Sequence, residues 1–253
     1  MHESQRPVGP PATLLSLLEW RAFAEFYGAL GALPWLRHAP RGDGHPVVVV
    51  PGFLSDHRST WLLRLHLKQL GYLALDWGQG RNVGPIGKVE AALLALLRQL
   101  RDRTGLRPSL VGWSLGGVYA RVLAHDAPEE LRSVITLGSP LRFPHRSAAD
   151  SLYERISGQD QPPDFVRGIF AAPPVPATSI YSRMDGVVSW RSCLSEEGAQ
   201  SENIRVCGSH CGLASNARVL WMVADRLSQP EGRWRRYVPP PLALLRSVRP
   251  QRS

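Results

Sequence analysis

Cysteine is scarce in this 253-residue chain, which contains only Cys193, Cys207 and Cys211. Three cysteines are too few, and too odd in number, to build a disulfide scaffold, so a hydrophobic core must hold the fold. Long apolar runs are also missing, because no stretch reaches the roughly 18 to 20 residues that cross a bilayer. Since 43% of the residues are hydrophobic and 20% are charged, we expect a soluble folded protein.

The N-terminus has no convincing secretory signal. An apolar run at 12–18 is followed at once by Glu19 and Arg21, where a signal peptide should stay uncharged. We therefore predict a cytoplasmic protein whose thiols are reduced. A disulfide that Cys193 forms with one of the other two cysteines is the open alternative.

Lysine is nearly absent, although the chain has a net charge of +9. A basic surplus favours an acidic partner such as nucleic acid when it covers the folded body. Here most of the surplus lies in residues 232–253, which hold six arginines and no acid. Because Lys68 and Lys88 are the only lysines and Arg, Ala, Gly and Pro are common, the composition indicates GC-rich coding. We expect no nucleic-acid partner.

Strand-like and helix-like stretches alternate along the body of the chain. The patterns predict strands at 47–50, 72–76, 109–111, 134–137, 178–182 and 203–206, and helices at 60–70, 86–103, 115–124 and 214–227. Helical crossovers of this length favour parallel strands. We predict an α/β fold, with a mostly parallel central sheet and helices on both faces. It forms a single domain over residues 1–231, followed by a basic, Pro-rich and loosely held tail at 232–253.

Residues 13–33 have apolar side chains at helical spacing, with Glu19, Arg21 and Glu25 between them. We predict one amphipathic helix that packs on the surface of the domain. Weak association of this helix with a membrane surface is the alternative.

Prolines interrupt the alternation at 142–177 and prevent one long helix there. We predict a short lid-like insertion over the carboxyl ends of the strands, where ligands gather in open parallel sheets. Phe165 and Phe170 lie on a short apolar helical face within it. This face is expected to roof a substrate pocket for an acyl chain, to which Trp113 adds apolar surface.

The strongest motif is Gly-Trp-Ser-Leu-Gly at 112–116, between an apolar strand and an apolar helix. A sharp turn from strand to helix gives Ser114 a strained backbone and lifts its hydroxyl clear of the sheet. Gly112 and Gly116 let the strand and the helix pack closely around it. The amide of Leu115 lies at the positive end of the helix, where it can hold a developing oxyanion.

A serine nucleophile needs a base, and the histidines after Ser114 are His125, His145 and His210. His125 ends the helix that Ser114 begins, about 16 Å away at 1.5 Å per residue, which is out of reach. His145 lies in the insertion. His210 follows the predicted strand 203–206 in a loop before a helix, so we predict that it is the base.

The acid that orients the base is expected between the serine and the histidine in the chain. Asp185 follows the predicted strand 178–182 and is our candidate, because catalytic groups gather at the carboxyl ends of parallel strands. The other acids are Asp160 and Asp164 in the insertion and Asp225 within a helix.

A second oxyanion donor is expected after the first strong strand, in Pro-Gly-Phe-Leu at 51–54. Pro51 has no N–H and Gly52 permits the turn. The backbone amide of Phe53 is the predicted donor, and that of Leu54 is the alternative.

A glycine-rich stretch at 78–84 does not match a dinucleotide fingerprint, because its spacing is G-x-G-x-x-x-G. We interpret it as a loop in which Arg81 or Asn82 is a candidate to line the substrate-binding mouth of the site.

Three clustered side chains resemble part of a zinc site, namely Cys207, His210 and Cys211. Three ligands fall short of the four that a structural zinc ion takes, and His210 is better explained as the base. We predict neither a metal nor another cofactor.

Taken together, these segments resemble the α/β-hydrolases of the bacterial lipase and esterase type. The resemblance spans roughly 46–227 and rests on five motifs, at 50–53, 112–117, 136–140, 185–188 and 208–213. It implies a nucleophile, an acid, a base and two oxyanion-hole amides, at Ser114, Asp185, His210, Phe53 and Leu115 respectively. Secreted lipases of this type usually have His-Gly in place of Pro51-Gly52, and they carry a signal peptide and often a larger lid. These departures argue against a secreted fat-digesting role.

The expected activity is that of a serine hydrolase, which cleaves carboxylic esters of a small-molecule acyl substrate through an acyl-enzyme intermediate. Acyl transfer at the same site is the alternative, because the choice between water and another acceptor depends on how residues 142–177 exclude water. A noncatalytic binding protein on a hydrolase scaffold is a further alternative, which the intact set of three residues disfavours.

Overall fold

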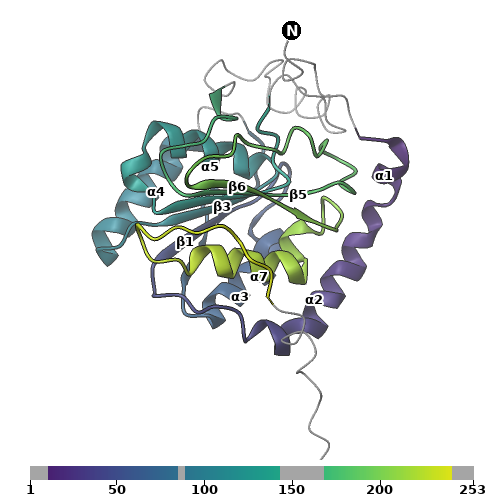
Figure 1. Cartoon of the computed structure of the whole chain (residues 1–253), viewed down its shortest axis with the longest axis horizontal. Helices are drawn as coiled ribbons and strands as arrows, with labels where there is room; N and C mark the ends of the chain where they lie inside the picture. The colour runs from purple at the N-terminus through teal and green to yellow at the C-terminus, as the bar shows by residue number, and fades with distance from the viewer. Residues whose placement is uncertain (1–10, 85–88, 143–167, 241–253) are drawn as a thin grey trace, which may run out of the picture.

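The computed structural model describes residues 11–84, 89–142 and 168–240. Its centre is a six-stranded, all-parallel sheet in the order β2-β1-β3-β4-β5-β6 (Figure 1). The strands are β1 (Pro46–Val50), β2 (Leu73–Asp76), β3 (Ser109–Trp113), β4 (Ser133–Leu137), β5 (Ala177–Ser182) and β6 (Ser201–Val206). Each predicted strand overlaps one of these, and the predicted α/β architecture is confirmed.

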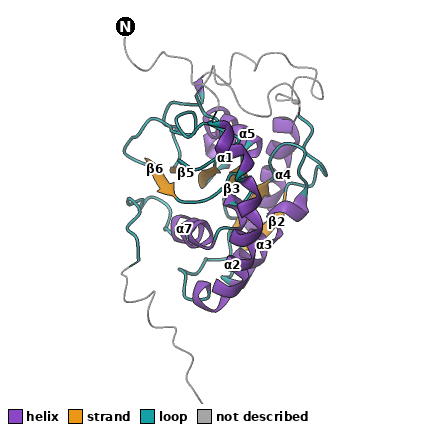
Figure 2. Cartoon of the chain, turned by 90° about the vertical axis from the view of Figure 1, so that its right-hand side faces the viewer, coloured by secondary structure: helices purple, strands orange, loops and turns teal. Residues whose placement is uncertain are grey.

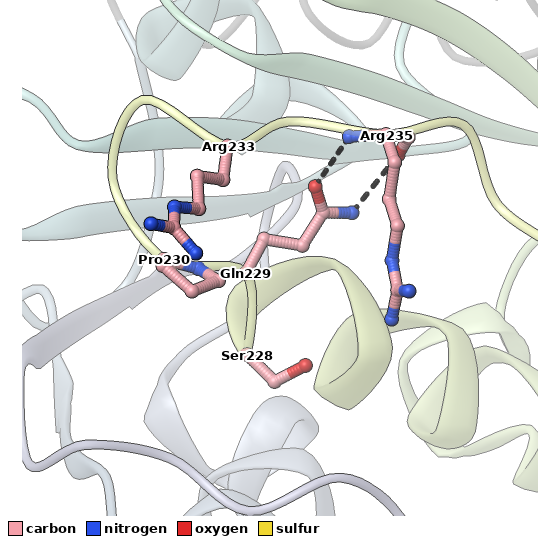
Figure 3. A pocket seen from close by; sticks show the side chains of 5 residues that line it. All are labelled: Ser228, Gln229, Pro230, Arg233 and Arg235. Atoms are coloured by element: carbon pink, nitrogen blue, oxygen red, sulfur yellow. Dashed lines mark hydrogen bonds between the residues drawn. The ribbon is translucent and has the colours of Figure 1, made fainter.

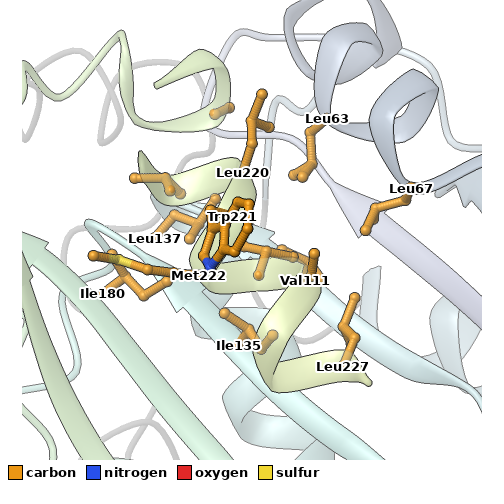
Figure 4. Close-up of a cluster of buried hydrophobic side chains, with 14 of the residues drawn as sticks. Leu63, Leu67, Val111, Ile135, Leu137, Ile180, Leu220, Trp221, Met222 and Leu227 are labelled. Carbon is orange, nitrogen blue, oxygen red and sulfur yellow. The ribbon is translucent and has the colours of Figure 1, made fainter. Parts of the chain in front are cut away.

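Helices cover both faces of the sheet. The main helices after β1 are α3 (Trp61–Gln69), α4 (Val89–Thr104), α5 (Leu115–Asp126) and α7 (Ala217–Leu227), with short 3-10 turns at His57–Thr60, Pro128–Glu130 and Leu213–Ser215. One buried cluster joins α3 and α7 to the sheet, and Figure 4 shows Leu220, Trp221 and Leu227 of α7 within it. A second cluster joins α4 and α5 to the opposite face. The sheet is therefore buried on both sides, as the apolar run of β1 predicts.

The strand register brings four loop positions to one edge of the sheet. Trp113 of β3 pairs with Leu137 of β4, which pairs with Ile180 of β5. Ile180 pairs in turn with Ile204 of β6. Because all these strands are parallel, the loops that follow them open side by side.

The N-terminal segment, residues 11–36, is not the single helix that its periodicity predicts. It forms α1 (Thr13–Leu17), a 3-10 turn (Glu19–Arg21) and α2 (Ala22–Leu36). The interruption allows the Glu19 side chain to accept hydrogen bonds from loops at the carboxyl edge of the sheet. One face of α2 packs on the core, while five large apolar side chains are at least 65% exposed, namely Leu14, Leu17, Trp20, Phe23 and Tyr27.

Most of the expected lid, including Phe165, lies outside the described residues. The structure describes the end of the insertion from Gly168 onward, where the chain runs back toward β5. Ile169 in this part is buried in the core beside α4 and α5. The buried guanidinium of Arg121, on α5, donates to the carbonyls of Ile169 and Ala171, both at 3.0 Å. Arg121 therefore ties the return of the insertion to the main fold.

The described beginning of the basic tail, residues 232–240, is attached to the body of the protein. Gln229 forms a reciprocal pair with the backbone of Arg235, which Figure 3 shows at the rim of a small pocket. Further along, the backbone N–H of Tyr237 donates to the buried carboxylate of Glu202 at 2.9 Å. The body of the protein therefore supplies partners for backbone groups in this part of the tail. Among the described residues, no helix is both long and apolar enough to cross a membrane.

Candidate active site

Ser114 occupies a sharp turn between β3 and α5, with a φ of 52° and a ψ of −123°. A positive φ is strained for a serine, and among the described non-glycine residues only Leu54 shares it. The turn is tight because a side chain at Gly112 would collide with the backbone of Gly116 and Gly117. One at Gly116 would collide with the backbone of β1. The two glycines thus have the packing role that the sequence motif predicts.

The side chains of Ser114, His210 and Asp185 form one hydrogen-bonded chain. His210 Nδ1 lies 2.7 Å from Asp185 Oδ2, and His210 Nε2 lies 3.0 Å from Ser114 Oγ. Because an ionised carboxylate only accepts, Nδ1–H donates to Asp185, and Nε2 is left to accept from the serine hydroxyl. The structure therefore brings the three predicted residues together, each from a loop that follows a different strand.

Asp185 and His210 are both held by contacts that involve the backbone. Asp185 is buried, and its second oxygen accepts from the backbone N–H groups of Val187 at 2.9 Å and Val188 at 2.7 Å. The indole N–H of Trp113 donates to the carbonyl of His210 at 3.1 Å. These contacts fix the orientation of the carboxylate and the position of the loop that carries the imidazole.

The charges around His210 raise its pKa above the ordinary value of 6.5. Burial alone lowers the pKa, because it disfavours the charged imidazolium. The carboxylate of Asp185 outweighs burial through its charge and its hydrogen bond, and Glu19 adds to the effect. The site thus favours the protonated imidazole that arises when a base takes a proton from a hydroxyl.

The turn after β1 lies directly against Ser114. A side chain at Gly52 would place its first carbon 3.1 Å from the Cβ of Ser114. The backbone N–H of Leu54 is occupied, because it donates to the carbonyl of Asn82 at 2.7 Å. This bond leaves Leu54 unsuited to the oxyanion role that was its alternative assignment. Phe53 and Leu115, the predicted donors, are both partly exposed.

Asn82 is fully buried rather than placed at the mouth of the site. Its side-chain N–H donates to the carbonyl of Pro51 at 2.8 Å, and its side-chain oxygen accepts from the Tyr119 hydroxyl at 3.0 Å. Since both ends of the amide are engaged, Asn82 braces the turn at 51–54. The predicted contact with substrate does not fit this position.

The other predicted substrate-binding residues are placed differently from one another. Trp113 is only 8% exposed and packs beside the His210 ring, with centroids 5.9 Å apart. Phe170 is partly buried beneath the guanidinium of Arg142, whose carbon lies 3.9 Å from the ring centroid. Phe165 lies outside the described residues, so the acyl roof stays a prediction.

Sequence reasoning missed two residues that lie next to Asp185 or His210. Gly138, after β4, has a φ of 56°, and an added side chain would come within 3.1 Å of Asp185 Oδ2. Glu19 accepts from the backbone N–H of His210 at 2.9 Å across 191 residues of sequence. The glycine lies in a motif that resembles hydrolases, whereas nothing local in the sequence marks Glu19.

Metal ligands do not cluster in the described part of the chain, where no group of three or more His, Cys, Asp or Glu side chains fits an ion. The cysteines Cys193, Cys207 and Cys211 are unpaired in the structure. The thiol of Cys193 is buried, which raises its pKa.

Comparison with known sequences identifies the family. Residues 47–250 match the Alpha/beta hydrolase family. The chain belongs to this family. The pimeloyl-[acyl-carrier protein] methyl ester esterases of two Legionella pneumophila strains, Paris and Corby, are each 31% identical over 102 residues. That match covers 40% of this chain, and the chain spans 41% of the length of each of these relatives.

Solved structures of other hydrolases share the fold. A thermostable carboxylesterase from a metagenomic library, EstE1, has a TM-score of 0.57 at 15% identity, covering 75% of this chain and 82% of its own. One of the metagenome-derived lipolytic enzymes LipS and LipT has a TM-score of 0.56 at 17% identity, covering 74% and 93%. At these identities the likeness concerns the fold alone.

Proposed function

We propose that this α/β-hydrolase cleaves carboxylic (acyl) esters, with Ser114 as nucleophile, His210 as base and Asp185 as orienting acid. The observation that carries the proposal is the continuous hydrogen-bonded chain from Asp185 through His210 to Ser114. The family is consistent with it, because the chain belongs to the hydrolases and resembles esterases at low identity.

The first half of the reaction follows from the direction of the hydrogen bonds. The Ser114 hydroxyl gives its proton to Nε2 of His210 while its oxygen bonds to the acyl carbon. Asp185 stabilises the resulting imidazolium through Nδ1–H. When the tetrahedral intermediate collapses, the bond to the alcohol oxygen breaks, and His210 returns the proton to the leaving alcohol.

The second half repeats these steps with water. His210 takes a proton from water as the water oxygen attacks the acyl-enzyme, and it then returns that proton to Ser114 Oγ as the acid is released. The backbone N–H groups of Phe53 and Leu115 are the proposed oxyanion hole in both halves. The position of Leu115 at the first residue of α5 supports this role, because a helix N-terminus stabilises negative charge.

An acyl ester is the substrate class that the relatives favour. The partial match is to esterases whose name gives pimeloyl-[acyl-carrier protein] methyl ester as the substrate. We infer that the leaving group is a small alcohol, while the length of the acyl chain is open to a screen. p-Nitrophenyl esters of increasing chain length would measure that preference as kcat/KM.

A fluorophosphonate probe tests the proposal directly, because it phosphonylates only an activated serine. We expect stoichiometric labelling of the wild-type protein, with the label on the peptide that contains Ser114 and none on a Ser114→Ala variant. Absence of labelling, or labelling of another serine, would refute the assignment. Absence of any labelling would favour a noncatalytic binding protein on this scaffold, whereas labelling of another serine would move the nucleophile to that residue.

Product analysis distinguishes acyl transfer at the same serine from hydrolysis. With an ester substrate and added alcohol, a hydrolase releases mainly the free acid. If the new ester is the main product at low alcohol concentration, the enzyme is an acyltransferase that uses the same three residues.

A further inference from the structure

The N-terminal segment contacts both loops that carry the proposed acid and base, Asp185 and His210. The acid loop is residues 183–188, and the base loop is residues 207–212. The hydroxyl of Ser16 donates to the carbonyl of Gly186, and the guanidinium of Arg21 donates to the carbonyl of Met184 at 3.0 Å. In Figure 2, α1 and α2 run one after the other along the side of the molecule that faces the viewer.

Glu19 joins the two loops through a single carboxylate. Its Oε1 accepts from the backbone N–H of Gly186 in the acid loop, at 2.8 Å, and from that of His210 in the base loop, at 2.9 Å. Its Oε2 accepts from the backbone N–H of Cys211 at 2.9 Å. One side chain from the N-terminal segment therefore fixes the separation of the loops that carry Asp185 and His210.

Glu25 binds the base loop but not the acid loop. Its carboxylate accepts from the backbone N–H of Ser209 at 2.7 Å and from the side chain of Asn216 at 3.1 Å. The glycines of the base loop make room for it, since a side chain at Gly208 would place its first carbon 2.9 Å from Glu25 Oε2. The two glutamates share the base loop, but only Glu19 reaches the acid loop.

We infer that Glu19 is a positioning residue of the triad, which aligns His210 with Asp185 by holding both of their loops and supports the imidazolium with its charge. This inference rests on the proposed function, because alignment matters only if His210 transfers protons. The interruption of the N-terminal helix at Glu19–Arg21 is the local structure that makes the contact.

Several charged groups lie around His210 among the described residues. Asp185 bonds to its ring, and Glu19 and Glu25 of the N-terminal segment accept from backbone N–H groups of the base loop. Arg21 of the same segment donates to the acid loop, and the thiol of Cys211 neighbours His210 in the base loop. Burial raises the pKa of Glu19, but the N–H groups of Cys211, His210 and Gly186 outweigh it and lower the pKa. Glu19 is therefore ionised at neutral pH, as its role requires.

Glu19→Gln tests the inference, with Glu25→Gln as the matched control in the same N-terminal segment. Glutamine keeps one oxygen for Gly186 and His210, but it loses the charge and the bond to Cys211. We expect kcat to fall roughly 10- to 100-fold with KM little changed, because the residue aligns a proton carrier and does not touch substrate. In a plot of kcat/KM against pH, the acidic limb, where activity falls as His210 is protonated, should move roughly 0.3 to 1 pH unit lower. The reason is that the imidazolium loses a stabilising charge.

The control variant separates this electrostatic role from general loosening of the loop. Glu25→Gln should leave the acidic limb where it is in the wild type. A limb that moves equally in both variants, or that moves in neither, would overturn the inference. A wild-type protein without Ser114-dependent esterase activity would instead refute the proposed function, so the two failures are distinguishable.

Glu19→Asp decides the matter if the glutamine variant does not fold. Aspartate keeps the charge but is one methylene shorter, so it should lower kcat and leave the acidic limb near its wild-type position. Wild-type kcat in Glu19→Asp would overturn the inference. Loss of folding in both variants, measured by circular dichroism, would show that Glu19 has a purely structural role.

Discussion

Gly138 lies beside the hydrogen bond between His210 and Asp185, where an added side-chain carbon would be 3.2 Å from His210 Nδ1 and 3.1 Å from Asp185 Oδ2. The same carbon would also meet Leu213 at 2.7 Å. The backbone φ of 56° disfavours any side chain at this position. The loop after β4 thus contributes to the triad by leaving space for it.

Gly138→Ala should lower kcat by roughly tenfold or more, because the methyl group displaces the acid and the base from each other. The strained φ should also cost about 1 to 2 kcal/mol of unfolding free energy. Gly105→Ala is the matched control, since Gly105 has a φ of 70° and open space around it. The control should lose similar stability in urea denaturation but keep kcat. Equal kcat in the two variants would contradict the prediction.

The sheet and the sharp turn at Ser114 were predictable because their signals are local. The run Val47–Val50 is apolar at every position, as buried parallel strands are, and the glycines at 112 and 116 belong to the turn that they permit. His210 and Asp185 followed from their positions after predicted strands. In each case a short window of sequence contains both the residue and the reason for its place.

The N-terminal contacts could not be predicted in the same way. The apolar spacing of residues 13–33 is that of a helix, and periodicity does not show that Glu19 turns toward a loop 191 residues away. Asn82 was misplaced for a related reason. Its loop is rich in glycine, a composition that predicts an exposed loop. In the structure its side chain instead forms buried hydrogen bonds with the Pro51 carbonyl and the Tyr119 hydroxyl. Such polar pairings depend on tertiary packing.

Ser114→Ala should abolish ester hydrolysis, to a residual level ~10⁶-fold below the wild type, because the covalent route is lost. Only one hydroxyl leaves the structure, so the circular dichroism spectrum should be unchanged. Hydrolysis of a p-nitrophenyl ester measures the loss. Substantial activity in a folded Ser114→Ala protein would show that another residue is the nucleophile.

Asp185→Asn should lower kcat by roughly 10⁴-fold. The oxygen of the new amide would stay with the N–H groups of Val187 and Val188, so its NH₂ would face His210 Nδ1. The histidine must then carry its proton on Nε2, where it cannot accept from Ser114. Asp160→Asn and Asp164→Asn are the comparison variants. If one of these comparison variants loses most of its kcat while Asp185→Asn keeps nearly wild-type kcat, the acid lies in the insertion.

The pH dependence of the wild-type enzyme should show an acidic limb above pH 6.5 in kcat/KM. Catalysis requires neutral His210, and the site raises the pKa of this residue above 6.5, so activity is lost as the pH falls through the raised value. Initial rates with a p-nitrophenyl ester between pH 5 and 9 test this, once the rates are corrected for ionisation of the product. A limb well below pH 6.5 would contradict the predicted electrostatics of the site.

Asn82→Ala should lower kcat while leaving KM for esters of different chain length nearly unchanged. The substitution removes the buried partner that Asn82 gives to the Pro51 carbonyl and the Tyr119 hydroxyl. The loss at the Pro51 carbonyl should cost about 1 to 3 kcal/mol of stability. The turn at 51–54 then loses its brace, and the proposed oxyanion donor at Phe53 moves.

Tyr119→Phe is the matched control for Asn82→Ala, because it removes only the hydroxyl at the far end of the pair and leaves the bond from Asn82 to Pro51. We expect it to reduce kcat less than Asn82→Ala does, with thermal unfolding measured on both proteins. If Asn82→Ala instead raises KM for long acyl chains and spares kcat, then Asn82 contacts the substrate. That outcome would support the first interpretation of the sequence over the bracing role that its buried hydrogen bonds indicate.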